Sequence, residues 1–384
     1  MQALHANTRS TWDSDPLIVR ITKIAVRPEP YRTQEALILT DSSTGTPGFR
    51  AYFHIENTVN SQSDVASWLR PLVEIPSSPS YLDNGDIVRL NPRSGEMRVL
   101  YRKNSRFNSL LVTQRCNNRC VMCSQPPRNS ADGYLVNELL QAIPLMGIDT
   151  PELVLTGGEP TLLPDELLRL VRCCASNLPH TCVLLLSNGR FFTYLSYCEA
   201  LSTIKHPSLT IAVPLYSSLS NEHDFIVQAN GAFDQTVRGI MNLGRCHQRI
   251  ELRVVIHRLN CERLPEMAEF IARNLPFVAH VALMGMEPTG FARANLDQLW
   301  VDPAAYSSLL SEAVHELSRH HICTSIYNHQ LCTLPVELWR YARQSISDWK
   351  DTFLNECSPC SVRGQCCGFF ASAVDHHSSA VKAI

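Results

Sequence analysis

The stretch CNNRCVMC, residues 116–123, decides how the rest of the chain is interpreted. It places three cysteines on a short loop, directly after an apolar segment at 110–114 that is typical of a strand. Thiolates are soft ligands that suit iron–sulfur clusters or zinc. A structural zinc site uses four protein ligands, and the next candidates, Cys173 and His180, are distant in sequence. Three ligands on a four-iron cluster would leave one iron open to a small molecule.

The segments around this loop alternate between short apolar runs and amphipathic stretches. Such runs favour a parallel sheet that is covered by helices. Predicted strands occupy 110–114, 152–157, 182–188, 209–216, 251–257 and 278–286, and predicted helices occupy 135–146, 164–177, 193–204, 233–246, 264–275 and 302–321. We therefore predict an α/β fold, a partial (β/α)6 barrel over residues 106–321. Active sites in such folds form at the C-terminal ends of the strands.

The two ends of the chain depart from this pattern. Residues 1–105 are β-rich, with predicted strands at 16–24, 35–41 and 49–57 and a hairpin at 85–102. They predict a small N-terminal β domain for packing or partner docking. Residues 322–384 form a cysteine-rich C-terminal extension, with a short strand at 324–328, a helix at 335–345 and a frayed terminus from 371.

Polar and glycine-rich motifs follow the later predicted strands. Gly157, Gly158, Glu159 and Pro160 follow the second strand. Glycines allow close approach of the backbone, and their N–H groups can bind a carboxylate. The other candidates at strand ends are Ser187 and Asn188, Ser217, Arg253 and His257, and Glu287. Taken singly, each also fits a plain structural role, such as a turn or a salt-bridged arginine.

A second cysteine group lies in the C-terminal extension. Cys357, Cys360 and Cys366 have CX2CX5C spacing, and Cys332 follows the short strand upstream. These four thiols predict an auxiliary iron–sulfur cluster, with a structural zinc site as the alternative. Cys367 could replace Cys366, and His329 is a further alternative ligand. The remaining cysteines are interpreted as core residues or inert thiols.

The CX3CX2C spacing, followed by GGEP and SNG at successive strand ends, resembles the radical S-adenosylmethionine (SAM) superfamily. The resemblance implies a 4Fe–4S cluster on Cys116, Cys120 and Cys123. It also implies that SAM is cleaved after one-electron reduction to a 5′-deoxyadenosyl radical that abstracts hydrogen. The residues implied to contact SAM are Gly157, Gly158, Glu159, Pro160, Ser187, Asn188, Ser217 and Arg253. Met122 departs from the bulkier residue often found before the last cysteine.

The C-terminal extension resembles the shortened "twitch" form of the SPASM extension, which carries one auxiliary cluster. Together, CNNRCVMCSQPPR, LVLTGGEPTLL, LLLSNGR, RVVIHRLN and the tail from YNHQLC to CSPCSVRGQCCGFF resemble the HxsC family of His-Xaa-Ser system radical SAM maturases. That resemblance implies a precursor peptide with His-Xaa-Ser repeats, a companion radical SAM maturase and a small accessory protein. A reductant such as flavodoxin or ferredoxin is also expected. Cys367 stands where this family would have glycine.

Composition limits the other function classes. The chain has 384 residues, of which 45% are apolar, and a net charge of -2. It contains no block of like charges that would indicate nucleic-acid binding. It has no apolar run of transmembrane length and no recognisable signal peptide, so we expect no membrane partner and a cytoplasmic location. The alternatives are a radical SAM enzyme on a small molecule (molybdopterin-biosynthesis-like), a sulfatase-maturase-like enzyme and a non-catalytic iron–sulfur or zinc scaffold that binds peptide.

Overall fold

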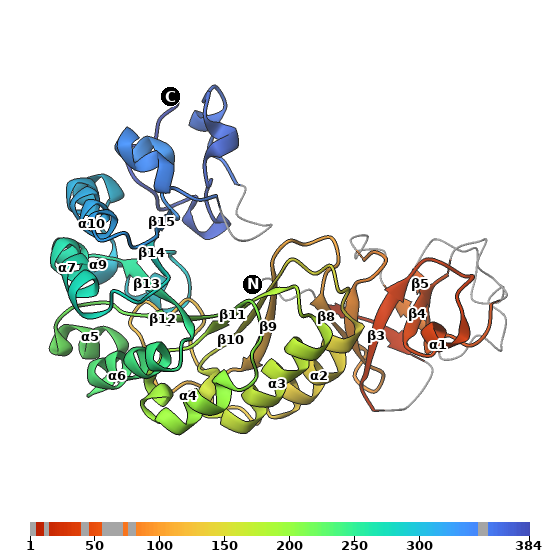
Figure 1. The fold of residues 1–384 in the computed structure, drawn as a ribbon. Coiled ribbons are helices and arrows are strands. Elements are labelled where there is room, and N and C mark those ends of the chain that lie inside the picture. Colours follow the sequence, from red (N-terminus) through yellow and green to blue (C-terminus); the bar gives the residue numbers. More distant parts are fainter. Residues whose placement is uncertain (1–4, 11–14, 40–45, 56–71, 76–81, 345–351) are drawn as a thin grey trace. The chain divides into compact units, whose positions relative to one another are not determined.

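The computed structural model describes residues 5–10, 15–39, 46–55, 72–75, 82–344 and 352–384 (Figure 1). The ends of the predicted strands at 35–41 and 49–57 and of the predicted helix at 335–345 lie partly outside the described residues. The chain forms two compact units. The first comprises Met1–Leu110, Gly133–Leu153 and Leu170–Thr181, and the second comprises Leu111–Asp132, Val154–Arg169 and Cys182–Ile384.

The first unit contains an eight-stranded mixed sheet in the order β1-β8-β7-β3-β4-β5-β6-β2. Its strands are β1 (His5–Asn7), β2 (Arg9–Ser10), β3 (Leu17–Thr22), β4 (Glu35–Ile38), β5 (Ala51–Ile55), β6 (Leu72–Ile75), β7 (Ile87–Asn91) and β8 (Glu96–Tyr101). The pairs from β3 to β6 are parallel, whereas β7 and β8 form the predicted antiparallel hairpin. The β-rich prediction is therefore confirmed for the described residues.

Helix α2 (Tyr134–Ala142) belongs to this first unit, although it follows the first strand of the other sheet. Its Glu138 is buried and pairs with two arginines, Arg89 on β7 and Arg98 on β8. A buried carboxylate needs such partners because the loss of hydration is otherwise costly. The ion pairs thus join α2 to the N-terminal sheet.

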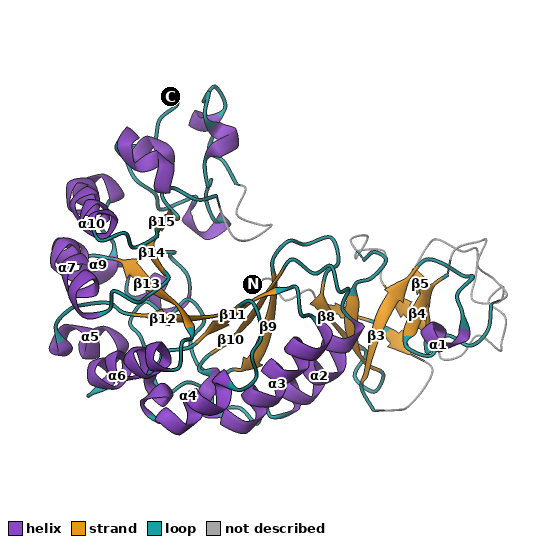
Figure 2. Ribbon diagram, in the orientation of Figure 1, coloured by secondary structure: helices purple, strands orange, loops and turns teal. Residues whose placement is uncertain are grey.

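The other sheet is curled and has seven strands in the order β15-β14-β13-β12-β11-β10-β9 (Figure 2). These are β9 (Asn108–Thr113), β10 (Glu152–Gly157), β11 (Cys182–Leu186), β12 (Leu209–Pro214), β13 (Arg249–Ile256), β14 (His280–Gly285) and β15 (Thr324–Tyr327). All pairs from β11 to β15 are parallel. The α/β class with a parallel sheet is confirmed. The segment predicted as a short strand of the extension is the seventh strand of this sheet.

Helices cover the outside of the parallel sheet, and most of the predicted helices are found at their predicted positions (Figure 1). They are α3 (Pro164–Asn177), α4 (Leu195–Ser202), α5 (Ser220–Val227), α6 (Ala232–Arg245), α7 (Leu264–Asn274), α8 (Gly290–Ala294), α9 (Leu296–Leu299) and α10 (Ser307–Arg319). Pro164 opens α3, where proline's fixed φ suits the first turn. Among the described residues, no helix has both the length and the apolar character that a bilayer crossing requires.

Two segments of the C-terminal region differ from their predictions. The helix predicted at 335–345 is a shorter 3-10 helix, Val336–Tyr341, and its Trp339 Nε1 donates to the carbonyl of Leu331 at 3.0 Å. Residues 371–384, here named the tail strap, are docked rather than frayed. Asp302 accepts hydrogen bonds from the Ser378 hydroxyl at 2.5 Å and from Ser379 N–H at 3.0 Å.

Candidate active site

The first cysteine group lies on the loop that leaves the C-terminal end of β9. Asp132, which is buried, fixes the start of this loop by accepting from Thr113 Oγ1 at 2.8 Å and Arg115 Nε at 3.1 Å. Farther along, Arg119 N–H donates to the carbonyl of Val227 at 3.0 Å. Asn118 N–H donates to Cys116 Sγ at 3.4 Å. The loop is therefore held at its start by Asp132 and farther along by the end of α5 (Ser220–Val227).

Burial raises the pKa of all three thiols in this loop. The pKa of Cys116 rises to about 11 and that of Cys120 to about 12, in both cases first through desolvation and then through neighbouring negative charge, including Cys123. Buried thiols that influence one another suit a cationic iron–sulfur group, because bound iron compensates the thiolate charge. Among the described residues, no three His, Cys, Asp or Glu side chains surround a single-ion position. A cluster does not require that, because each thiolate binds a different iron.

The GGEP motif packs directly against the cysteine loop. Gly157 has φ of 154°, and a Cβ there would lie 2.2 Å from the carbonyl oxygen of Thr113. A Cβ on Gly158 would lie 2.2 Å from the carbonyl oxygen of Arg115. The N–H groups of Gly158 and Glu159 donate to these same two carbonyls, at 2.9 and 2.8 Å. The N–H of Gly158 is therefore already hydrogen-bonded within the protein, and the two glycines allow close packing of two loops.

Glu159 joins the second and third strand ends. Its side chain is fully buried and accepts from Ser187 Oγ at 2.8 Å and from Asn188 N–H at 2.6 Å. The backbone and hydroxyl of Thr161 also donate to it, at 2.9 and 2.6 Å. Burial raises the pKa of Glu159, against the opposing effect of these hydrogen bonds. Pro160 follows as the first residue of a short 3-10 helix.

Arg190, directly after SNG, is a site residue that the sequence reasoning missed. Its Nη1 donates to the carbonyl of Asn117 at 2.9 Å and to Asn118 Oδ1 at 2.6 Å. Asn188 Nδ2 adds a hydrogen bond to Asn117 Oδ1 at 2.6 Å. The third strand end thus holds the cysteine loop from its outer side. The only signal in the sequence was an arginine beside a recognised motif, with nothing to identify its partner.

Ser217 and Arg253 stand at the next two strands. The buried Ser217 hydroxyl donates to Glu222 at 2.6 Å and accepts from Leu219 N–H at 3.1 Å. Arg253 lies on β13 and donates from Nε to Glu251 at 2.7 Å. Glu251 also contacts His280 Nδ1 at 2.9 Å, so Arg253 begins a polar row across β13 and β14.

Tyr216 and His257 form the buried aromatic part of this strand-end region. Their ring centroids are 6.5 Å apart. Burial, and then the charges of Cys120 and Cys123, raise the pKa of Tyr216 well above its ordinary value. Burial lowers the pKa of His257 to about 4, so this imidazole is neutral near pH 7. Its Nδ1 accepts from Leu259 N–H at 3.3 Å, whereas its buried Nε2 has no hydrogen-bond partner among the described residues.

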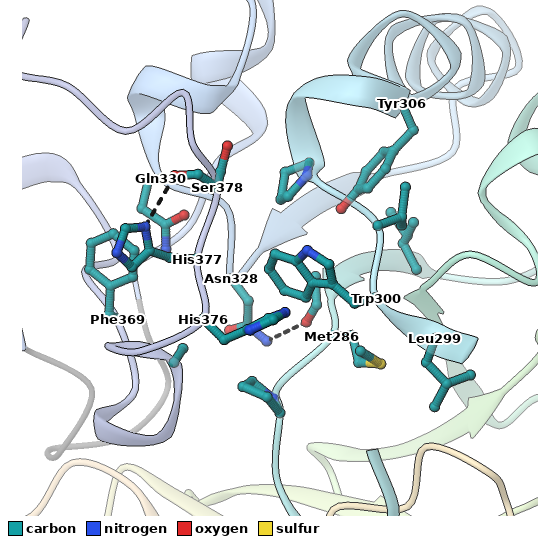
Figure 3. Close-up of a pocket in the computed structure, with 16 residues that line it drawn as sticks. Met286, Leu299, Trp300, Tyr306, Asn328, Gln330, Phe369, His376, His377 and Ser378 are labelled. Carbon is teal, nitrogen blue, oxygen red and sulfur yellow. Dashed lines mark hydrogen bonds between the residues drawn. The ribbon is translucent and has the colours of Figure 1, made fainter. Parts of the chain in front are cut away.

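A pocket opens beyond β13 and β14, against the tail strap (Figure 3). Trp300, His376 and Phe369 line it with aromatic surface, and Asn328 and Gln330 contribute amides. Trp300 and His376 pack edge to face, with centroids 4.5 Å apart. Glu287 lines a smaller adjoining pocket. The position is typical of a substrate pocket because it lies beside the strand ends.

Three thiols of the second cysteine group, Cys332, Cys357 and Cys366, influence one another electrostatically. The pKa of Cys332 is raised by burial first and then by the charges of Cys366 and Cys357. Cys360 N–H donates to the carbonyl of Cys357 at 3.2 Å, so these two share one turn. A hydrogen bond from Cys367 lowers the pKa of Cys366 to about 6.

The two alternative ligands of this group also form hydrogen bonds outside it. Cys367 is buried, and its Sγ donates to the carbonyl of His329 at 3.3 Å. His329 Nε2 is 2.8 Å from the Tyr306 hydroxyl, and His329 Nδ1 is 2.9 Å from the carbonyl of Tyr327. Burial lowers the pKa of His329 to about 4. Cys366 is therefore better disposed than Cys367 toward Cys332.

Comparison with known proteins identifies the central part of the chain. Residues 110–271 match the sequence model of the radical SAM superfamily. This segment, less than half of the chain, has the sequence of a radical SAM enzyme domain, which implies a 4Fe–4S cluster and SAM. None of the curated proteins matches the sequence.

Similar solved structures include three radical SAM or SAM-bound proteins. Streptococcus suis SuiB bound to precursor peptide SuiA is 15% identical, with 60% of this chain and 50% of that chain covered and a TM-score of 0.47. A radical SAM methyltransferase from Sphaerobacter thermophilus is 15% identical, with 63% and 72% covered and a TM-score of 0.44. Native anSMEcpe with bound AdoMet and Cp18Cys peptide is 14% identical, with 57% and 62% covered and a TM-score of 0.45. The match thus spans half the length of SuiB.

Proposed function

We propose that this protein is a radical SAM peptide maturase of the HxsC type, which takes hydrogen from a ribosomally made precursor peptide with His-Xaa-Ser repeats. The observation that carries the radical SAM part is the hydrogen-bonded union of three motifs. The loop with Cys116, Cys120 and Cys123, the GGEP turn and the SNG turn meet at the ends of β9, β10 and β11. The peptide, the companion maturase, the small accessory protein and a cytoplasmic location rest on the sequence resemblance.

In this proposal each strand end has a defined task. Cys116, Cys120 and Cys123 hold the 4Fe–4S cluster, and Arg190 holds their loop in place. When reduced, the cluster supplies the electron that cleaves SAM to methionine and a 5′-deoxyadenosyl radical. The contacts to SAM come from Gly157, Gly158, Glu159, Pro160, Ser187, Asn188, Ser217 and Arg253. Glu159 acts mainly by orienting Ser187 and Asn188, because its carboxylate already accepts four hydrogen bonds.

An auxiliary cluster, proposed as 4Fe–4S, takes Cys332, Cys357, Cys360 and Cys366. Its support is the electrostatic effect of Cys357 and Cys366 on Cys332, together with the hydrogen bond from the buried Cys367 to the His329 carbonyl. The twitch form of the C-terminal extension is part of the same proposal. We also propose domain limits of 1–105, 106–321 and 322–384 for the three functional parts.

The test is to purify the protein anaerobically, reconstitute iron and sulfide, and measure iron per chain and 5′-deoxyadenosine release from SAM. We expect about eight irons in the wild type and about four in the triple variant Cys116→Ala, Cys120→Ala and Cys123→Ala, which should cleave no SAM. Zinc in place of iron would favour a metal-stabilised binding scaffold. Intact SAM cleavage in the triple variant would overturn the proposal.

The substrate is tested by adding a His-Xaa-Ser precursor peptide to the active wild type. Mass spectrometry distinguishes the products, because a crosslink removes two hydrogen atoms whereas an epimerisation leaves the peptide mass unchanged. SAM cleavage with no change in the peptide by mass or by chiral analysis would favour a radical SAM enzyme on a small molecule.

A further inference from the structure

The segment that carries the first cysteine group has an unusual charge. From Leu110 to Ala131 it contains three arginines and no aspartate or glutamate. The whole chain, in contrast, has 34 basic and 36 acidic residues. The first acidic residue after the loop is Asp132, and it is buried and paired with Arg115. The segment itself therefore contributes only positive side-chain charge before Asp132, on a weakly negative protein.

Two of these arginines, Arg119 and Arg128, are exposed and are here named the basic rim. Within the described part of the chain, neither guanidinium forms an ion pair. Their backbones are fixed, because Arg119 N–H donates to Val227 at 3.0 Å and Arg128 N–H donates to Gln114 at 2.9 Å. A positive rim on a fixed backbone can attract and orient a negatively charged partner.

We propose that the basic rim is the docking surface for an acidic one-electron carrier protein of the flavodoxin or ferredoxin class. This inference rests on the proposed function, because it takes the cluster to be held by Cys116, Cys120 and Cys123. The rim belongs to the same loop as these cysteines, so a docked carrier lies next to the group that must be reduced. In the transfer the carrier loses one electron and the cluster gains one, and no bond forms or breaks.

The other arginines near the first cysteine group already form side-chain hydrogen bonds. Arg115 is bound to Asp132, and Arg190 is bound to Asn117 and Asn118. The basic rim has no comparable partner within the described residues, and none of the proposed SAM contacts belongs to it. Its arginines can therefore be changed without removing a ligand of either cofactor.

The experiment compares a charge-reversed rim, Arg119→Glu with Arg128→Glu, with a matched control. The control, Arg245→Glu with Arg249→Glu, makes the same change in net charge at exposed arginines near the start of β13, the opposite end of the strands. For each protein, 5′-deoxyadenosine release is measured with photoreduced flavodoxin and, separately, with dithionite. Iron per chain is measured on the same samples.

We expect the rim variant to be at least about tenfold slower than wild type with flavodoxin, because complementary charge speeds association by that order or more. With dithionite, and in iron content, it should equal wild type. The neutral variant, Arg119→Gln with Arg128→Gln, should be intermediate. Added salt should slow the flavodoxin-driven wild type more than the rim variant, since screening weakens exposed charges.

Three results would overturn the inference. Equal slowing in the control would mean that net charge alone matters. An unchanged flavodoxin-driven rate in the rim variant would mean that the carrier docks elsewhere. A defect that appears only when precursor peptide is added, with dithionite as reductant, would mean that the rim binds the peptide. Absence of SAM cleavage by wild type with dithionite would instead remove the proposed function, and the two failures are therefore distinguishable.

Discussion

The two cysteine groups of this protein are built on different kinds of support. The first lies on a loop that is hydrogen-bonded to the ends of β10 and β11, through Glu159 and Arg190. The second lies on short turns, Asn355–Cys357 and Arg363–Gln365, that follow the last strand of the sheet. In the proposed function, the first metal group would therefore be held by the strand ends, and the second by local turns and a docked tail.

The two groups also differ in how the protein affects their thiols. Burial raises the pKa of Cys116 to about 11, whereas hydrogen bonding lowers the pKa of Cys366 to about 6. The tail strap contributes to the second group, because Lys382 N–H donates a hydrogen bond toward Cys332. We therefore expect the first group to depend on the strand ends and the second to depend on the strap.

The largest expected effect on SAM cleavage comes from replacing the glycine next to the first cysteine group, compared with the glycine next to the second. Gly158→Ala would place a Cβ 2.2 Å from the Arg115 carbonyl, whereas a Cβ on Gly364 meets nothing within 4 Å. We expect Gly158→Ala to reduce SAM cleavage by about 100-fold or more, since small displacements of a reacting group carry costs of that order. Gly364→Ala should match wild type. Iron content and 5′-deoxyadenosine release measure both, and a strong defect in Gly364→Ala would contradict the difference in support.

The next effect distinguishes the adjacent thiols of the second group. Cys366→Ala should remove about four of about eight irons per chain, whereas Cys367→Ala should keep them. The reason is that Cys367 Sγ donates to the His329 carbonyl, while Cys366 lies near Cys332. Iron analysis and the electron paramagnetic resonance of the reduced protein provide the readout. The reverse pattern would assign the auxiliary site to Cys367.

Much of the parallel sheet could be predicted from the sequence, because strand and helix periods are local. The strand at Glu152–Gly157 and the helix at Pro164–Asn177 lie where the apolar pattern places them. The proximity of the GGEP and SNG turns to the cysteine loop also follows from topology, because parallel strands end at one edge. What the glycines contact could not be predicted, because their neighbours, the Thr113 and Arg115 carbonyls, belong to a different segment of the chain.

The wrong predictions concern segments whose structure depends on distant residues. The terminal segment has no apolar pattern of its own. It docks on Asp302, and this contact could not be predicted because Asp302 lies far earlier in the chain. In the helix predicted at 335–345, which is of the 3-10 type, Trp339 similarly donates to a carbonyl outside the segment, that of Leu331. Arg190 was missed for the same reason, because its partners lie on another strand end.

A smaller effect is expected when hydrogen bonds that hold the first cysteine group are removed and no side chain is forced into its loop. Arg190→Met removes the hydrogen bonds to Asn117 and Asn118, and we expect about tenfold slower SAM cleavage with iron content retained, as for other residues that orient metal ligands. A shift in the reduction potential of the cluster should accompany it. Arg363→Met is the matched change in the second group, where Arg363 packs over Phe353 at 4.7 Å. Equal effects on SAM cleavage would show that the frame does not single out the first group.

The smallest effect concerns Asp302, which holds the tail strap. Burial alone would raise its pKa, but hydrogen bonds from Ser378, Ala304 and Ser379 outweigh burial and leave the pKa below its ordinary value of 3.8. Its stabilising contribution is therefore present above that value and is lost as the pH falls through the lowered pKa. In Asp302→Asn the contribution is missing at neutral pH as well.

We expect Asp302→Asn to speed proteolytic cleavage of the tail strap about five- to tenfold at pH 7, from loss of about 1 kcal/mol per hydrogen bond. The exposed Asp297→Asn is the control. Iron should leave the second group faster under a chelator, and the first group should keep its iron, because the strap's Lys382 N–H donates a hydrogen bond toward Cys332 of the second group. Equal loss from both groups would mean that the strap stabilises the whole unit. Retention by both would mean that the turns around Cys357 and Cys366 hold the second group without the strap.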